Sequence, residues 1–256
     1  MDVTAFLDRF PLWSLLPLTV AIALLSVEAG RRLAGYRLKR SVEEKEQPVG
    51  GMVGGTLGLL AFMMAFTFGL ASTRFEARRQ ILLQEANAIG TCYLRAEMLS
   101  DPMRTESRNL LREYVDVRLE AVKPGQLEQG MAKSEQVLHR LWAVAVTTAE
   151  KEKNVITSLF ITSLNQVIDL HSTRVMAGVR SRVPGIIWIV LYLLLVLVML
   201  MLGYQSGLAK SRRSLAVLAL VIGFSSVLYL IADLDRPGQG MLQTNQETMT
   251  DLRRTM

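Results

Sequence analysis

The sequence predicts an all-α integral membrane protein with four transmembrane helices and a long helical bundle between the second and the third. Three observations support this prediction. Hydrophobic residues make up 50% of the 256 residues and are concentrated in a few blocks. Four of these blocks are long enough to cross about 30 Å of hydrocarbon as helices. The segment between the second and third blocks has the periodicity of amphipathic helices.

The four apolar blocks are expected to be helical because a chain inside hydrocarbon must satisfy its own backbone hydrogen bonds. They cover about residues 12–29, 52–71, 184–203 and 215–232. We do not expect the first block to be a cleaved signal peptide, since no basic region precedes it. The blocks predict four parts: a first transmembrane hairpin over 1–71, an extramembrane helical bundle over 72–183, a second transmembrane hairpin over 184–235, and a polar, loosely held C-terminal tail over 236–256.

The bundle is predicted from one long apolar stripe and two helix breaks. The stripe recurs at steps of three, four and seven residues and consists of Phe75, Leu82, Ala86, Ile89, Tyr93 and Ala96. No breaker separates Leu70 from Arg78, so the second span should continue into this helix. Breaks at Asp101-Pro102 and Pro124-Gly125 predict two more helices over about 102–122 and 126–180. Their expected core faces include Leu111, Val115, Val122, Leu138, Leu141, Trp142, Ala145, Ala149, Ile156, Phe160, Ser163, Leu164, Val167 and His171.

Composition argues against several functional classes. The net charge of +6 is typical of membrane proteins, whose Lys and Arg flank the spans, so we do not expect nucleic-acid binding. The single cysteine, Cys92, excludes an internal disulfide and is interpreted as a small buried residue. His139 and His171 are interpreted as surface or packed residues and not as metal ligands. The sequence has no nucleophile elbow, phosphate loop or HExxH motif. We therefore expect no enzyme activity, cofactor or metal.

Two features have more than one interpretation. The glycine-rich stretch Gly50–Gly55 opens the second span; its small residues favour close helix packing, and a helix N-terminus that receives an anion is the alternative. Glu28, Asp233 and Asp235 lie at the ends of spans. Lipid headgroups usually solvate such acids, but acids near a bilayer can also mark an ion path.

The second span carries the most informative pattern. Phe62 and Phe66 are four residues apart and share one helix face with Gly58 and Leu70, and Thr73-Arg74-Phe75 follows directly. Phenylalanines that face lipid would give the same pattern. The run also resembles the second membrane helix of the bestrophins, and FEARRQ-x-L-x-x-EANAIGT resembles the bacterial bestrophin-like domain family of unknown function.

This resemblance implies a pentameric ion channel with Phe62 and Phe66 in its hydrophobic neck, Gly58 and Leu70 on the same face, and Thr73, Arg74 and Phe75 as a helix extension. Gly58 departs from the bulky residue usual in that family, Phe75 replaces a tryptophan, and the tail lacks the acidic run that binds calcium in animal members. The implied partners are a lipid bilayer, other copies of the chain and inorganic ions. A membrane-anchored helical interaction or signalling scaffold without a pore is the alternative.

Charge alone does not determine the orientation of the chain in the membrane. The two short loops hold nine Lys and Arg residues, and the opposite side holds eight near the spans. The first helix by itself favours an N-terminus outside the cytoplasm. The resemblance favours a bacterial inner membrane protein whose bundle is cytoplasmic, and we adopt this as the expectation.

Overall fold

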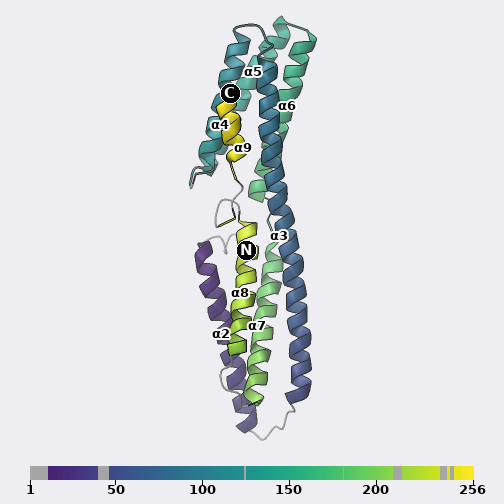
Figure 1. Cartoon of the computed structure of the whole chain (residues 1–256), viewed down its shortest axis with the longest axis vertical. Helices are drawn as coiled ribbons and strands as arrows, with labels where there is room; N and C mark the ends of the chain where they lie inside the picture. The colour runs from purple at the N-terminus through teal and green to yellow at the C-terminus, as the bar shows by residue number, and fades with distance from the viewer. Residues whose placement is uncertain are drawn as a thin grey trace. The chain divides into compact units, whose positions relative to one another are not determined.

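The computed structural model describes residues 11–39, 46–123, 125–180, 182–209, 215–236, 241–242 and 245–256. These residues are helical apart from short turns and loops, which confirms the all-α prediction. The chain forms two compact units (Figure 1). Unit 1 contains Met1–Thr73 and Arg182–Leu242, and unit 2 contains Arg74–Ser181 and Gln243–Met256.

Unit 1 contains the membrane spans. They are α2 (Leu12–Lys39), the first part of α3 (Glu46–Ala96), α7 (Gly185–Leu208) and α8 (Leu215–Asp235). All four helices are long and apolar enough to cross a membrane, which confirms the four predicted spans. The expected continuation of the second span is also confirmed, because α3 is one uninterrupted helix of 51 residues.

Helices α2 and α7 pack with their backbones in direct contact. A Cβ atom added to Gly30 would lie 2.0 Å from the carbonyl oxygen of Leu200, and one added to Gly203 would lie 2.0 Å from that of Val27. Small residues at a membrane helix interface allow this close approach. A hydrogen bond of 2.9 Å between the hydroxyls of Thr19 and Tyr192 joins the same two helices.

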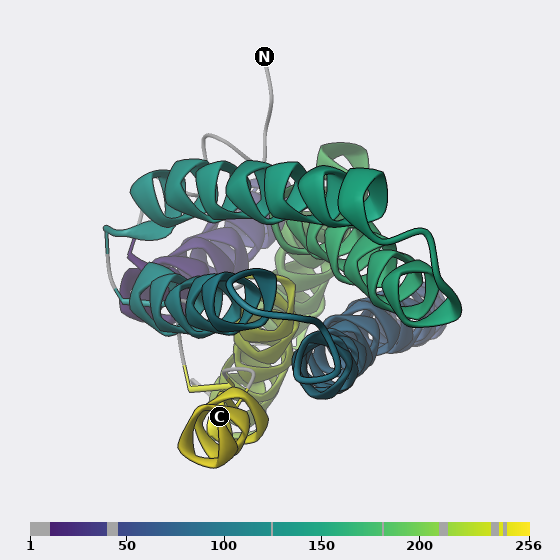
Figure 2. The same ribbon diagram turned by 90° about the horizontal axis from the view of Figure 1, so that it is seen from above.

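Unit 2 is a helical bundle around an apolar core. The last part of α3 is joined by α4 (Met103–Ala121), α5 (Leu127–Lys151), α6 (Val155–Val175), a π-helical turn η1 (Met176–Arg180) and α9 (Glu247–Thr255). Figure 2 looks down on these helices. The predicted stripe of α3 is buried from Leu82 to Ala96, and Phe75 is half-buried. Of the other expected core residues, Val122, Trp142 and Ile156 are exposed.

Two expectations, one about the bundle and one about the C-terminal tail, are wrong. The predicted helix over 126–180 is interrupted at residues 152–154, where the Asn154 side chain accepts a hydrogen bond of 2.9 Å from the Thr157 amide and caps α6. Asparagine is a strong N-cap, and this local bond competes with continuation of the helix. The tail is not loosely held over residues 247–255, because α9 packs on unit 2 with Met249 fully buried (yellow in Figure 2).

Candidate functional site

The membrane part of α3 has two opposite faces. Leu60, Met64 and Thr67 are buried against the rest of unit 1. Phe62 and Phe66 keep 67% and 65% of their surface exposed. At 3.6 residues per turn the two sets point in opposite directions. The chain therefore leaves two large aromatic side chains on a face that its own spans do not cover.

The other predicted residues of this helix flank the aromatic pair. Gly58 is exposed one turn before Phe62, and Leu70 is half-buried one turn after Phe66. A Cβ atom added to Gly58 would meet nothing within 4 Å. Thr73 is exposed, and its hydroxyl donates to the Gly69 carbonyl at 2.9 Å. In unit 2, Arg74 and Phe75 are half-buried.

An apolar groove of about 540 Å³ runs between α3 and α8. Its α3 wall includes Ala61, Ala65 and Phe68, and its α8 wall includes Gly223 and Phe224. Ala61 and Ala65 each precede one of the exposed phenylalanines by a single residue. The groove is thus adjacent to the aromatic face and offers small residues along which another helix can approach closely.

The acids at the end of α8 are buried. Asp235 accepts a hydrogen bond of 2.7 Å from the Val183 amide and lies 3.6 Å from Nε of Arg182. Asp233 accepts a hydrogen bond of 3.1 Å from the Met241 amide. The acids therefore bind the segments before α7 and after α8, and they are not solvated by headgroups as the first interpretation of these positions assumed.

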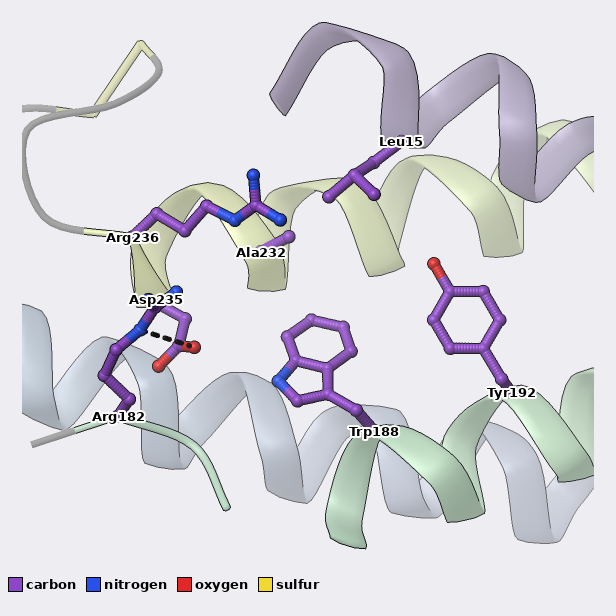
Figure 3. Close-up of a pocket in the computed structure, with 7 residues that line it drawn as sticks. All are labelled: Leu15, Arg182, Trp188, Tyr192, Ala232, Asp235 and Arg236. Carbon is purple, nitrogen blue, oxygen red and sulfur yellow. Dashed lines mark ion pairs between the residues drawn. The ribbon is translucent and has the colours of Figure 1, made fainter. Parts of the chain in front are cut away.

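Asp235 and Arg182 line a small cavity, whose other walls are formed by Leu15, Trp188, Tyr192, Ala232 and Arg236 (Figure 3). Its volume of about 10 Å³ is close to one water-sized sphere. The dimensions suit a bound water and not a larger ligand. The third acid, Glu28, is partly exposed and pairs with Arg32 at 3.0 Å.

Unit 2 has a charged cluster in its core. Glu85 is fully buried, and its two carboxylate oxygens lie 3.2 and 3.3 Å from Arg118 nitrogens, while Nε of Arg174 lies 3.1 Å from Oε2. The Tyr114 hydroxyl donates to Glu85 at 2.8 Å and is 3.1 Å from Nδ1 of His171. Residues from α3, α4 and α6 therefore meet at one carboxylate.

Burial, and after it the charges of the two arginines and one carboxylate, shift the pKa values in this cluster. Burial, and then the Arg174 charge, lower the pKa of His171 to about 4, so the imidazole is neutral at pH 7. Burial and the Glu85 charge raise the pKa of Tyr114 well above its usual value. Burial and the Arg118 charge lower the pKa of Arg174. Of these three side chains, His171 is the one that takes up a proton as the solution becomes acidic.

The sequence has one signal for this cluster, although none of the predictions above includes Glu85. Glu85 lies three residues after Leu82 and four before Ile89, so it occupies the apolar stripe itself. A carboxylate at a core position requires a buried partner. The sequence did not indicate which of the many arginines would supply it, because Arg118 and Arg174 lie 33 and 89 residues away.

The remaining residues that the sequence analysis singled out do not belong to any of these sites. His139 is exposed and lies 4.0 Å from Glu135, whereas Cys92 is fully buried. Within the glycine stretch, only Gly50 has a close neighbour, Gln205, and Gly51, Gly54 and Gly55 border open space. The close packing expected for this stretch is therefore limited to Gly50 within a single chain.

Comparison with known proteins now gives the family. A model of the bestrophin-like domain matches residues 18–249. The chain belongs to the bestrophin-like domain family. No curated protein matches it.

Two solved structures share its fold. One is a bacterial bestrophin homologue from Klebsiella pneumoniae that carries a mutation, at 13% identity and a TM-score of 0.65, with 95% of this chain and 98% of that chain covered. The other is described as a membrane protein, at 11% identity and a TM-score of 0.65, with 95% and 96% covered. This bestrophin-like chain is thus a multi-pass membrane protein by fold and helix composition.

Proposed function

We propose that this bestrophin-like chain is one subunit of an oligomeric ion channel, with Phe62 and Phe66 in a hydrophobic neck. The observation that carries the proposal is the exposure of these two side chains on the α3 face opposite Leu60 and Met64. In a ring of subunits, this face would point to the axis. The two phenylalanines are one helical turn apart and would narrow the axis at two consecutive levels.

A narrow apolar ring opposes conduction by a simple physical effect. Water leaves a constriction lined only by phenylalanine rings, and an ion cannot cross a dry segment without losing its hydration. Small movements that widen the ring would let water return. Gly58 leaves the level before Phe62 without a side chain, so the constriction would be confined to the aromatic levels and have a wider mouth on that side.

The groove between α3 and α8 supports the ring arrangement. It lies beside the aromatic face and is lined by Ala61, Ala65 and Gly223 among other apolar residues. A helix of a neighbouring copy could approach closely along it. Closed rings use such head-to-tail contacts, in which one patch of a subunit meets a different patch of the next. A pentamer is the expected stoichiometry from the family resemblance.

The rival function is a membrane-anchored helical scaffold. It is favoured by a different observation, which is that unit 2 has a complete core and buried ion pairs of its own. Under that function the spans are anchors, and the exposed phenylalanines face lipid. The two functions differ in whether the spans surround an aqueous axis. We assign no catalytic activity to either.

Electron microscopy of the detergent-solubilised full chain tests the channel directly. We expect a closed ring of five copies with α3 innermost and a constriction at the level of Phe62 and Phe66. A monomer, a dimer or a ring with lipid on its axis would contradict the pore and favour the scaffold.

The orientation requires its own measurement. We expect the bundle to be on the cytoplasmic side of a bacterial inner membrane. Reporters fused at residue 125 and at the C-terminus should both be active in the cytoplasm. Periplasmic activity at both positions would reverse the orientation.

A further inference from the structure

Unit 1 has a second large cavity, of about 470 Å³, between the middle of α2, the end of α7 and the start of α8. The middle part of α2 contributes Leu24, Leu25 and Arg31. The end of α7 contributes Ser206, and the first turn of α8 contributes Leu215 and Leu218. The cavity therefore has a leucine-rich wall and a polar end. It is separate from the α3–α8 groove, with which it shares no lining residue.

The cavity lies where a membrane helix changes from apolar to charged. On α2, Leu24 and Leu25 belong to the apolar run, and charged residues begin at Glu28. Ser206 is near the end of α7 and Leu215 is the first residue of α8, so all three helices reach the same level. Leu24 and Arg31 are separated by about 10 Å along the helix axis. This distance covers a headgroup and the start of an acyl chain.

At the polar end of the cavity, α2 carries more basic than acidic residues. Glu28 and Arg31 line it, and Arg32 pairs with Glu28 at 3.0 Å. Over residues 28–32 of α2, the sequence has one acid and two arginines. Anionic groups are favoured there, and basic pockets between membrane helices at the headgroup level suit anionic lipids.

We propose that this cavity binds one anionic phospholipid, with its phosphate at Arg31 and Ser206 and an acyl chain along Leu24, Leu25 and Leu218. A cavity that opens between membrane helices is filled by hydrocarbon, since interiors do not retain voids of this size. The cationic end selects the headgroup. The proposal is independent of the pore.

A lipid fits better than a protein helix for two reasons. The apolar wall ends at a positive charge, which matches the order of groups in a phospholipid. The apolar side chains that line the cavity are leucines and valines, whereas the α3–α8 groove also has alanines and a glycine, which let helices approach closely. A second copy of the chain in this cavity is therefore an outcome that would overturn the proposal.

Native mass spectrometry of the purified full chain tests the proposal. The protein is titrated with phosphatidylglycerol or phosphatidylcholine of identical acyl chains, and the lipid retained per chain is counted. A third titration adds inorganic phosphate to the phosphatidylglycerol sample. The variants are Arg31→Gln and Arg31→Lys, with Arg37→Gln as the control because Arg37 is exposed on the same helix and does not line the cavity.

We expect tighter retention of phosphatidylglycerol than of phosphatidylcholine by the natural chain. Arg31→Gln should weaken phosphatidylglycerol retention about fivefold, the typical effect of one cation near a membrane surface. Arg31→Lys and Arg37→Gln should retain it as the natural chain does, and inorganic phosphate should not displace it. Equal loss for Arg31→Gln and Arg37→Gln, or displacement by phosphate alone, would overturn the proposal.

A second pair of variants tests the acyl-chain wall. Leu218→Trp fills the cavity and should reduce retention of both lipids, whereas Ile222→Trp, exposed one turn further along α8, should not. If Leu218→Trp dissociates the oligomer and leaves lipid retention intact, a second copy fills the cavity and the lipid proposal is wrong.

Discussion

The core of unit 2 and the packed faces of the unit 1 spans bury residues of different kinds. Unit 2 buries large side chains such as Ile89 and Phe160 together with the charged Glu85. The spans bring α2 and α7 together at Gly30 and Gly203 and leave many of their large side chains facing outward. In water, apolar side chains are driven inward, whereas in lipid they gain little by leaving hydrocarbon. Close packing of backbones then holds the helices together.

A charge placed in the core of unit 2 should have the largest effect on stability. Ile89→Asp places an unpaired carboxylate at a position with no exposed surface, and we expect it to cost several kcal/mol and unfold the bundle. Leu94→Asp is the matched control, because Leu94 lies on the same helix and keeps 62% of its surface exposed. Denaturant unfolding should separate the two variants, and equal stability would show that the stripe does not face the core.

Removal of the buried Glu85 carboxylate should have the next largest effect on the free energy of unfolding. Glu85→Gln leaves Arg118 and Arg174 without a counter-charge, and the loss of one partner of a buried ion pair typically costs about 3–5 kcal/mol. Glu113→Gln removes an exposed pair with Arg140 and should cost less than about 1 kcal/mol. Denaturant unfolding of both variants provides the measurement. Similar small losses would mean that the cluster does not stabilise the bundle.

A substitution at Gly203 tests the close contact between α2 and α7. Gly203→Leu introduces a side chain where a Cβ atom already meets the Val27 backbone at 2.0 Å, so α2 and α7 must separate. Overpacking of this kind typically costs about 1–3 kcal/mol. Gly54→Leu, where a Cβ atom meets nothing within 4 Å, should have little effect. Thermal melting in detergent would distinguish the two, and a tolerant Gly203 would contradict the close α2–α7 contact.

The pH dependence of unit 2 depends on one partly buried side chain, His171. The pKa of His171 is lowered to about 4, so the folded protein keeps this imidazole neutral while the unfolded chain takes up a proton near pH 6.5. The unfolded state therefore binds more protons between these values, and stability should fall as the pH drops from about 6.5 to 4. His171→Gln should make this decline shallower. An unchanged pH profile would show that His171 does not contribute.

The parts of the fold that were predicted depend on local pattern. Span length, hydropathy and the period of the α3 stripe are properties of contiguous residues, and the spans and the long α3 helix followed from them. The break at Asn154 and the docking of α9 did not follow from such local properties. An Asn inside an amphipathic run gives little warning of a cap, and α9 is buried through Met249, whose partners are distant in sequence.

The candidate sites also differ in whether local sequence was enough to predict them. Phe62 and Phe66 were predicted from their spacing along one helix together with the family resemblance. The Glu85 cluster was missed because it joins three helices through residues as far apart as Glu85 and Arg174. Local pattern identifies a helix face, but only the tertiary structure shows which charges meet in the core.

The central claim is that Phe62 and Phe66 face an aqueous axis. Its most direct test is ion flux through liposomes combined with thermal stability for the double variant Phe62→Ala/Phe66→Ala, with Leu60→Ala/Met64→Ala on the buried face of the same helix as the control. We expect higher flux with nearly normal stability for the phenylalanine pair, and a loss of about 2–5 kcal/mol per residue for the buried pair. No flux in either the natural chain or the phenylalanine variant, together with a collapse in stability of that variant, would contradict it.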